Sequence, residues 1–213
     1  MMYHVGDFGC SGYDWALYHQ LETEPIMPPK LHIYPTNADL PPAVRYQVHS
    51  FMRIVWFDYD EYNVDLTVEE DEAQPTHIAV TNGSTLIAYA TVVWKNLTLA
   101  GQTYRCGGLA NVMTFPHFRK RGYGAQVVNA ATRIIQQSAD ADIAMLWTAH
   151  DNVPFYNRAG WEAMPEMITL IGDAKQPRVY DEEIGMMLFL SDKGKNNHAL
   201  FERERIYVGE WTW

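Results

Sequence analysis

The chain has 213 residues and a formal net charge of −10, from 16 Lys and Arg against 26 Asp and Glu. With 47% hydrophobic and 20% charged residues, it has the composition of a globular protein, and its length suits one domain with an arm. The acidic balance argues against a nucleic-acid partner, no apolar run reaches the ~20 residues of a membrane helix, and the first residues do not resemble a signal peptide.

The cysteines and histidines give no metal or disulfide pattern. Cys10 and Cys106 are far apart, so they form neither a disulfide framework nor a zinc site, and we expect a reducing, cytoplasmic location. The eight histidines are scattered without HExxH-type spacing, and no metal is expected. The negative charge is compatible with simple solubility, and it also allows a cationic ligand drawn to an acidic cleft.

The N-terminal part predicts an extension followed by the domain. Residues 1–29 have weak periodicity and end in a proline-rich stretch, so we interpret them as an extension before a domain over 30–213. Residues 31–34 predict a first strand. From Pro42, apolar residues recur at helical spacing and predict a helix, namely Val44, Val48, Phe51, Met52, Val55 and Trp56.

The middle of the chain has strand and hairpin signals. Short apolar runs predict strands over 77–80 and 86–94, joined by an Asn82-Gly83 turn. Residues 97–99 and 103–106 predict a second hairpin, and 107–115 a separate buried strand. The Gly107-Gly108 pair predicts a bulge or a splayed strand.

The remaining elements complete a mixed pattern. Residues 125–137 predict a helix with one apolar face, 143–148 a buried strand, 153–159 a short helix closed by Gly160, and 184–190 another strand. We therefore predict an α/β (α+β) domain.

The most informative motif is Arg119-Lys120-Arg121-Gly122-Tyr123-Gly124, between the strand over 107–115 and the helix over 125–137. Glycines let the backbone approach an anion, and the unpaired amides that open a helix point at it. The motif predicts a phosphate cradle, although a turn with solvated basic residues would give the same letters.

A second segment makes the pattern more specific. The stretch 118–124, followed by Val153-Pro154-Phe155-Tyr156-Asn157-Arg158-Ala159-Gly160-Trp161, resembles the GNAT superfamily of N-acetyltransferases. The resemblance covers about 30–213 and is strongest over 105–161. It implies a mixed, mostly antiparallel sheet flanked by helices, with two splayed central strands and acetyl-CoA between them.

The resemblance also implies roles for individual residues. The main chain of Val112, Met113 and Thr114 would pair with the pantetheine arm. The pyrophosphate loop would comprise Arg119, Lys120, Arg121, Gly122, Tyr123, Gly124 and Ala125. Tyr156 would protonate the departing CoA thiolate, unless it is only a packing aromatic beside Phe155.

The base that deprotonates the amine is unassigned. Family members often carry a Glu on the strand before the loop, but 108–112 contains no carboxylate. Asp58, Asp60, His150 and Asp151 are alternatives, each also explained as a solvated or capping residue. The amine could also arrive neutral, or the protein could lack catalysis.

A narrower resemblance concerns the aminoglycoside 2′-N-acetyltransferases. The acidic run Asp181-Glu182-Glu183 and the terminal segment 209–213 are similar to that subfamily, in which the chain end binds substrate ammonium groups. The resemblance points to Glu210 and the Trp213 carboxylate. The expected substrate pocket comprises Asp58, Asp60, Asp181, Glu182, Glu210 and Trp213, unless Trp211 and Trp213 only pack the last strand.

Together these features predict an acetyl-CoA-dependent N-acetyltransferase acting on a primary amine of a small or polycationic molecule, such as an aminoglycoside or polyamine. Two alternatives stay open: a non-catalytic acyl-CoA-binding or sensing module, and a protein or peptide N-acetyltransferase. Residues 1–29 could cover the acceptor cleft or join a partner subunit in a homodimer.

Overall fold

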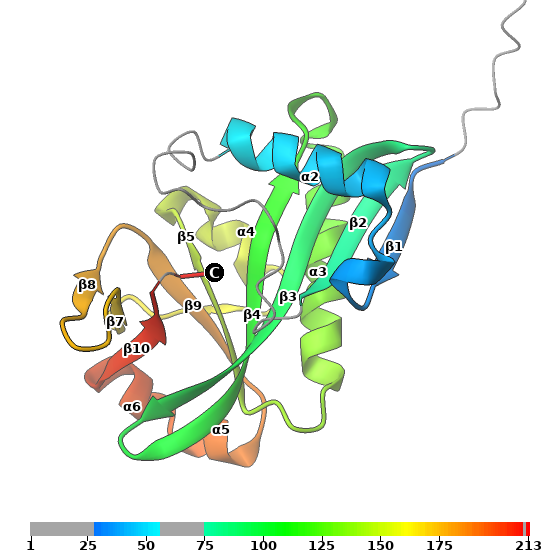
Figure 1. Cartoon of the computed structure of the whole chain (residues 1–213). Helices are drawn as coiled ribbons and strands as arrows, with labels where there is room; N and C mark the ends of the chain where they lie inside the picture. The colour runs from blue at the N-terminus through cyan, green and yellow to red at the C-terminus, as the bar shows by residue number, and fades with distance from the viewer. Residues whose placement is uncertain (1–27, 56–74, 211) are drawn as a thin grey trace, which may run out of the picture.

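Seven strands form one sheet in the order β1-β2-β3-β4-β5-β9-β6, and three more form a small sheet in the order β10-β7-β8 (Figure 1). The computed structural model describes residues 28–55, 75–210 and 212–213. In the large sheet β4 and β5 run parallel, whereas its other pairs are antiparallel. This architecture confirms the predicted α/β class with a mixed, mostly antiparallel sheet.

The elements of the first part are β1 (Lys30–Tyr34), η1 (Asn37–Asp39), α2 (Pro42–Val55), β2 (Thr76–Asn82), β3 (Thr85–Leu99), β4 (Gln102–Thr114) and η3 (Pro116–Phe118). Those of the second part are α3 (Tyr123–Gln137), β5 (Ile143–Thr148), η4 (His150–Asn152), α4 (Val153–Asn157), β6 (Glu162–Ala163), β7 (Ile168–Ile171), β8 (Arg178–Tyr180), β9 (Ile184–Phe189), α5 (Asp192–Asn196), α6 (His198–Arg203) and β10 (Arg205–Gly209). In the described part of the chain, no helix is long and apolar enough to cross a bilayer.

Helices cover both faces of the large sheet. The apolar face of α3 packs on one side, with Val127, Val128 and Ile135 fully buried. On the other side α2 buries Val48 and Phe51 over β2, β3 and β4 (Figure 1). Both helices were predicted from the 3.6-residue spacing of their apolar residues, and burial of those residues is what stabilises them.

The predicted division of the central hairpin was wrong. Instead of separate strands over 86–94, 97–99, 103–106 and 107–115, β3 and β4 are two long continuous strands paired from Leu99↔Gln102 to Ala88↔Thr114. Lys95 is partly exposed and Asn96 is exposed, but both residues keep their strand partners Cys106 and Arg105. Backbone pairing in a strand tolerates a polar pair where one face reaches solvent.

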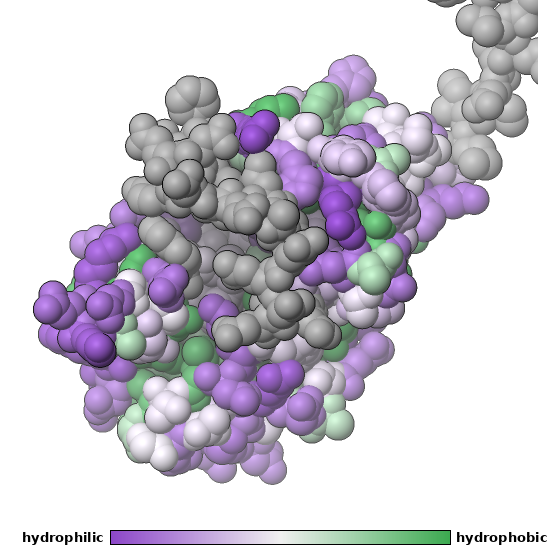
Figure 2. All heavy atoms as spheres, viewed as in Figure 1, coloured by the Kyte–Doolittle hydropathy of each residue, from purple (hydrophilic) through white to green (hydrophobic). Residues whose placement is uncertain are grey.

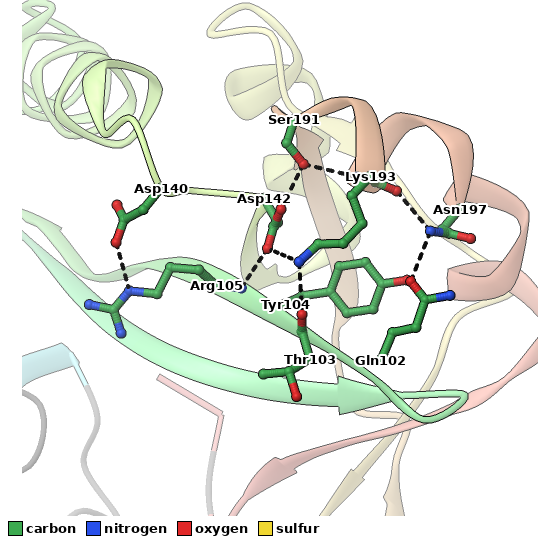
Figure 3. Close-up of polar contacts among 10 residues, drawn as sticks. Gln102, Thr103, Tyr104, Arg105, Asp140, Asp142, Ser191, Lys193 and Asn197 are labelled. Carbon is green, nitrogen blue, oxygen red and sulfur yellow. Dashed lines mark hydrogen bonds and ion pairs between the residues drawn. The ribbon is translucent and has the colours of Figure 1, made fainter.

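A polar clamp fastens the start of β5 to the start of β4. Figure 3 shows the Asp142 carboxylate, just before β5, accepting hydrogen bonds from the Arg105 amide (3.0 Å) and the Ser191 hydroxyl (2.7 Å) and pairing with Lys193. Burial alone would raise the pKa of Asp142, but hydrogen bonds from Lys193, the Arg105 amide and Ser191 hold this pKa below its ordinary value. The clamp therefore holds β4, β5 and α5 together at one end of the sheet.

Replacing Asp142 with Asn should lower the free energy of unfolding by about 2 kcal/mol. The side-chain NH2 group of Asn would face hydrogen-bond donors, because the partners of the Asp142 carboxylate are the Arg105 amide, the Ser191 hydroxyl and the Lys193 ammonium. Urea unfolding would measure the change. Asp140→Asn is the matched control, because Asp140 is 72% exposed, lies 3.7 Å from Arg105 and accepts a hydrogen bond from the Ser138 hydroxyl that the Asn side-chain oxygen can also accept. We expect the control to lose less than about 0.5 kcal/mol; equal losses in both variants would contradict the clamp.

The chain's last part forms the small sheet, which was not predicted. In it β10 runs parallel to β7, and β8 pairs antiparallel with β7. A second apolar cluster, with Met145, Trp147, Ile171 and Phe201 buried, joins this sheet to the face of β5 opposite α3. The small sheet and α2 therefore lie on the same side of the large sheet, at different places along it.

Candidate active site

The strands β4 and β5 pair over only three residues and then diverge. Their register runs Cys106↔Ile143, Gly107↔Ala144 and Gly108↔Met145, although β4 continues to Thr114 and β5 to Thr148. Beyond Gly108, the edge of β4 that faces β5 therefore has no strand partner within the described chain. The predicted splay is present, and it leaves main-chain groups of β4 open to a β-like contact with an extended ligand.

A bulge lies where the strands have diverged. The β3–β4 register shifts between Tyr89↔Met113 and Thr91↔Ala110, and Asn111 has a φ of 53°. The side-chain amide of Asn111 donates a hydrogen bond to the Thr91 hydroxyl at 3.2 Å, which holds the bulge in place. A bulge changes the direction in which the side chains and amides of a strand point, and bulges are frequent next to active sites.

The Gly107-Gly108 pair serves close packing rather than the predicted bulge. A Cβ on Gly107 would lie 3.1 Å from Ile135 of α3, and one on Gly108 would lie 2.0 Å from the indole Nε1 of Trp213. These residues are therefore glycines because side chains press on both faces of β4 there. The prediction of a bulge at this pair was wrong, whereas the prediction of a splay beside it was correct.

The N-terminus of α3 has free backbone amides at the position of the predicted cradle. The first helix amide with a backbone acceptor is that of Gln126, which donates to the Gly122 carbonyl at 3.1 Å. The preceding amides of Tyr123, Gly124 and Ala125 have no hydrogen bond to any other described residue, and no side chain caps the helix. Three free amides at a helix N-terminus form an anion site.

The loop before α3 leaves open space beside these amides. Gly122 has a φ of 85°, and a Cβ there would meet no atom within 4 Å, so the space above it is open. Lys120 also has a positive φ of 60°. The Arg119 guanidinium donates to the Thr114 carbonyl at 3.1 Å, which ties the loop to the end of β4. The exposed side chains of Lys120 and Arg121 add positive charge beside the amides.

The helix α4 brings Phe155 and Tyr156 to this region. Phe155 contacts the cradle, since its Cζ would lie 3.6 Å from a Cβ on Gly124. The rings of Phe155 and Tyr156 are 5.0 Å apart, and Tyr156 is 92% buried among residues of α3 and β5. The Tyr156 hydroxyl has a side-chain hydrogen bond with Thr148, the last residue of β5. The predicted acid therefore stands at the open end of the splay.

Burial sets the protonation state of Tyr156. Desolvation, with a smaller effect of the Glu183 charge, raises the pKa of Tyr156 to about 12 against the opposing hydrogen bond with Thr148. The phenol therefore stays protonated at neutral pH and can donate. The pKa of Tyr156 is above the ~8.5 of a free thiol. Burial raises the pKa of a thiol as well, which reduces the difference between the two groups. Cys106 of this chain, fully buried, has its pKa raised in this way.

The last residue, Trp213, lies where β4 and β5 begin to diverge. Its indole donates to the Met145 carbonyl at 3.2 Å and contacts Trp147 edge-on, with centroids 4.9 Å apart. The Lys95 ammonium lies 4.8 Å from the Trp213 ring centroid. Figure 1 marks this end of the chain over the sheet. The side chain of Trp213 therefore packs against the second apolar cluster and borders the site on the face opposite α3.

The structure separates the predicted acidic residues. Asp181 and Glu182 are exposed, and Glu182 pairs with Arg178 at 3.8 Å. Both residues directly follow β8, and Figure 2 shows a hydrophilic surface over β7 and β8. Glu210 is also exposed, and its backbone carbonyl accepts a hydrogen bond from the Gly172 amide at 3.1 Å. These three residues are thus not gathered around Tyr156.

The other predicted residues are either outside the described chain or exposed. Asp58 and Asp60 lie outside the described residues, as do Trp56, Trp211 and the extension up to residue 27. His150 and Asp151 are exposed in η4. The described chain contains no group of three or more His, Cys, Asp and Glu side chains able to hold a metal ion. The residue that sequence reasoning missed is Glu183, which is half-buried and interacts with Tyr156.

Comparison with known proteins places this arrangement in a family. The model of the acetyltransferase (GNAT) domain matches residues 36–164. The solved structure of the Escherichia coli GNAT family N-acetyltransferase YhbS in complex with CoA is 14% identical, with 87% of this chain and 92% of that chain covered and a TM-score of 0.59. No curated protein sequence gives a significant match.

Two further solved structures share the fold. Arabidopsis thaliana NAA60, in complex with a bisubstrate analogue, is 13% identical over 75% of this chain and 98% of that chain, with a TM-score of 0.53. An aminoglycoside 6′-N-acetyltransferase complexed with coenzyme A is 15% identical over 75% and 97%, with a TM-score of 0.50. At these identities the likeness concerns the fold.

Splayed strands, free amides at a helix N-terminus and a buried tyrosine are the features that the resemblance implied for a site that uses a CoA thioester. Since the family model covers more than half of the chain, the protein belongs to the acetyltransferase (GNAT) family. The resemblance inferred from 118–124 and 153–161 is thereby confirmed, as is the assignment to the N-acetyltransferase class of enzymes.

Proposed function

We propose that the protein transfers the acetyl group of acetyl-CoA to a primary amine of a small or polycationic acceptor, such as a polyamine or an aminoglycoside. The observation that carries the proposal is the convergence of three features at one end of the sheet. These are the open edge of β4 beyond Gly108, the free amides that follow Gly122, and the Tyr156 phenol beside Thr148.

The residues present fit the donor. The open space above Gly122 and the three free amides suit a diphosphate, with Arg119, Lys120 and Arg121 supplying charge. The main chain of Val112, Met113 and Thr114 lies on the unpaired edge of β4 and would bind an extended arm. When bound, acetyl-CoA supplies an activated acetyl group, and Tyr156 is positioned to give a proton to the leaving sulfur.

The net charge of the protein supports a cationic acceptor. The net charge of −10 favours positive ligands and disfavours nucleic acid or anionic membrane surfaces. An aminoglycoside acetyltransferase shares the fold, which is consistent with such an acceptor. Roles for Asp58, Asp60, Asp181, Glu182, Glu210 and Trp213 in acceptor binding, a homodimer and a cytoplasmic location stay predictions.

Thiol release from acetyl-CoA tests the proposal directly. The purified protein would be assayed with spermidine, kanamycin, single amino acids and a lysine peptide, and the acetylated product identified by mass spectrometry. We expect amine-dependent release with spermidine or kanamycin. Modification of the peptide alone would assign a protein or peptide acceptor. CoA binding without transfer to any amine would favour a sensing module and contradict the proposed reaction.

A further inference from the structure

Glu183 immediately precedes β9, and strand register places it close to Tyr156. The residue that follows it, Ile184, pairs with Thr148 at the end of β5. The Thr148 hydroxyl in turn interacts with the Tyr156 phenol. Glu183 is thus directly adjacent in sequence to the strand pair Ile184↔Thr148, beside which the proposed acid is held.

The two groups belong to opposite faces of the sheet. Along β9, Ile184, Met186 and Leu188 pack with α3 and α4, whereas Met187 and Phe189 pack in the cluster on the other face. Because side chains alternate along a strand, Glu183 falls on the face of Met187. This is the face that Trp213 borders, whereas Tyr156 approaches from the α3 face.

A hydrogen bond holds the carboxylate on that face. The Tyr180 hydroxyl of β8 donates to Glu183 Oε2 at 2.9 Å. Tyr180 also has a side-chain hydrogen bond with Thr212, one residue before Trp213. Burial and then the Glu183 charge raise the pKa of Tyr180, so this phenol remains a donor. The carboxylate is therefore fixed between β8, the chain end and the splay.

Only one member of the acidic run has this position. Asp181 and Glu182 are exposed, and Glu182 faces Arg178 instead. Glu183 is half-buried, and its charge contributes, after burial, to the raised pKa of Tyr156. The titratable groups that the described structure places around Glu183 are the Tyr180 phenol, the Tyr156 phenol and the neighbouring Glu182 carboxylate. Among the described residues, no Lys, Arg or His side chain forms an ion pair with Glu183.

We propose that Glu183 accepts the proton of the acceptor's ammonium group on the face opposite Tyr156, an inference that rests on the proposed acetyl transfer. An amine of pKa ~10 arrives protonated at pH 7 and has no lone pair to react. A partly desolvated carboxylate attracts the ammonium and removes one proton, which no residue of β4 over 108–112 can do.

The proton balance assigns one task to each side of the sheet. Glu183 takes the first proton from nitrogen, and the freed lone pair forms the bond to the acetyl carbon. As the carbon–sulfur bond breaks, its electron pair stays on sulfur, and Tyr156 gives its proton there. Tyr156 regains the second proton that leaves nitrogen. The net result is an amide, a free thiol and one proton, which Glu183 releases to solvent.

Glu183→Gln against Glu202→Gln tests the inference. Glu202, on α6, is the matched control, with the same loss of charge on an exposed side chain. With spermidine as acceptor at pH 7, we expect Glu183→Gln to lower kcat/KM about 100-fold, and the control to stay within about twofold. Calorimetry should give the same CoA affinity for both variants and the unmodified protein, because Glu183 lies away from the cradle.

The pH profile separates proton transfer from a structural role. With Glu183 in place, kcat/KM should be level from pH 7 to 9, because the ionised carboxylate reacts with the ammonium form. In Glu183→Gln the reaction needs the free amine, so kcat/KM should rise about tenfold per pH unit toward the amine's pKa of ~10. Tyr180→Phe, which removes only the hydrogen bond to Glu183, should keep the level profile.

Three results would overturn the proposal: turnover of Glu183→Gln within twofold of the unmodified protein, the same pH slope in both, or a Tyr180→Phe profile matching Glu183→Gln. Absence of transfer to spermidine, kanamycin and the lysine peptide by the unmodified protein would also overturn it, since no ammonium would then react. If CoA still bound in that case, the donor site would stand. Absence of CoA binding would remove the proposed function itself.

Discussion

Replacing Tyr156 with Phe should lower kcat by about 100-fold or more while leaving CoA affinity within about twofold. The variant removes one hydroxyl from a side chain that is 92% buried, so the ring keeps its packing. The loss would fall on proton donation to the departing sulfur, which the remaining side chains near Thr148 do not replace. Steady-state kinetics and calorimetry with CoA measure the two quantities separately.

The control for this variant is Tyr207→Phe, whose hydroxyl donates to the Gly172 carbonyl at 2.7 Å in the small sheet. It should keep its turnover. The pKa of Tyr156 near 12 has a further consequence, because a group acts as an acid only below its pKa. Deprotonation of Tyr156 should therefore cause no loss of activity between pH 7 and 10. Unchanged kcat in Tyr156→Phe would remove the acid assignment.

Gly122→Val should weaken CoA binding about 10- to 100-fold. Two effects act together: a β-branched residue is strained at a φ of 85°, and its side chain would occupy the open space beside the amides of Tyr123 and Gly124. The second effect excludes an anion from the cradle. Calorimetric titration of the variant with CoA gives the affinity, and thermal unfolding gives the cost in stability.

Gly101→Val is the control that measures the effect of backbone strain at a positive φ without changing the loop before α3. Gly101, at the tip of the β3–β4 hairpin, has a φ of 75° and equally open surroundings. Both variants should lose about 1–2 kcal/mol of stability from the left-handed conformation. Only the Gly122 variant should lose CoA affinity. Equal affinities in both would show that the loop does not hold the diphosphate.

The elements with strong local signals could be predicted from the sequence. The apolar spacing of α2 and α3, the Asn82-Gly83 turn and the compact run of β5 each depend on a few neighbouring residues, and all are present. The small sheet was missed because its strands have only three to five residues and little alternation. Such strands form because tertiary contacts, as at Ile171 and Ile206, bury them.

At the site, too, features with a local sequence signal could be predicted, and features that depend on distant segments could not. The loop and the free amides that open α3 were predictable because the glycines and the helix that follows are contiguous in the sequence. The short helix that carries Tyr156 was predictable because its segment is recognisable; the roles of these residues stay predictions. Among Asp181, Glu182 and Glu183, the sequence could not indicate which carboxylate faces the splay. That choice depends on the register of β9 against β5 and on Tyr180 from another sheet. Likewise, the need for glycine at 108 comes from Trp213, a contact of distant segments.

We propose that the backbone amides after Gly122 hold the diphosphate of a CoA thioester. Calorimetric titration of the full chain with CoA and with acetyl-CoA would test this binding. We expect one binding site per chain and a dissociation constant in the micromolar range, about 10- to 100-fold weaker in Gly122→Val but not in Gly101→Val. No measurable binding of either compound by the unmodified protein would contradict it.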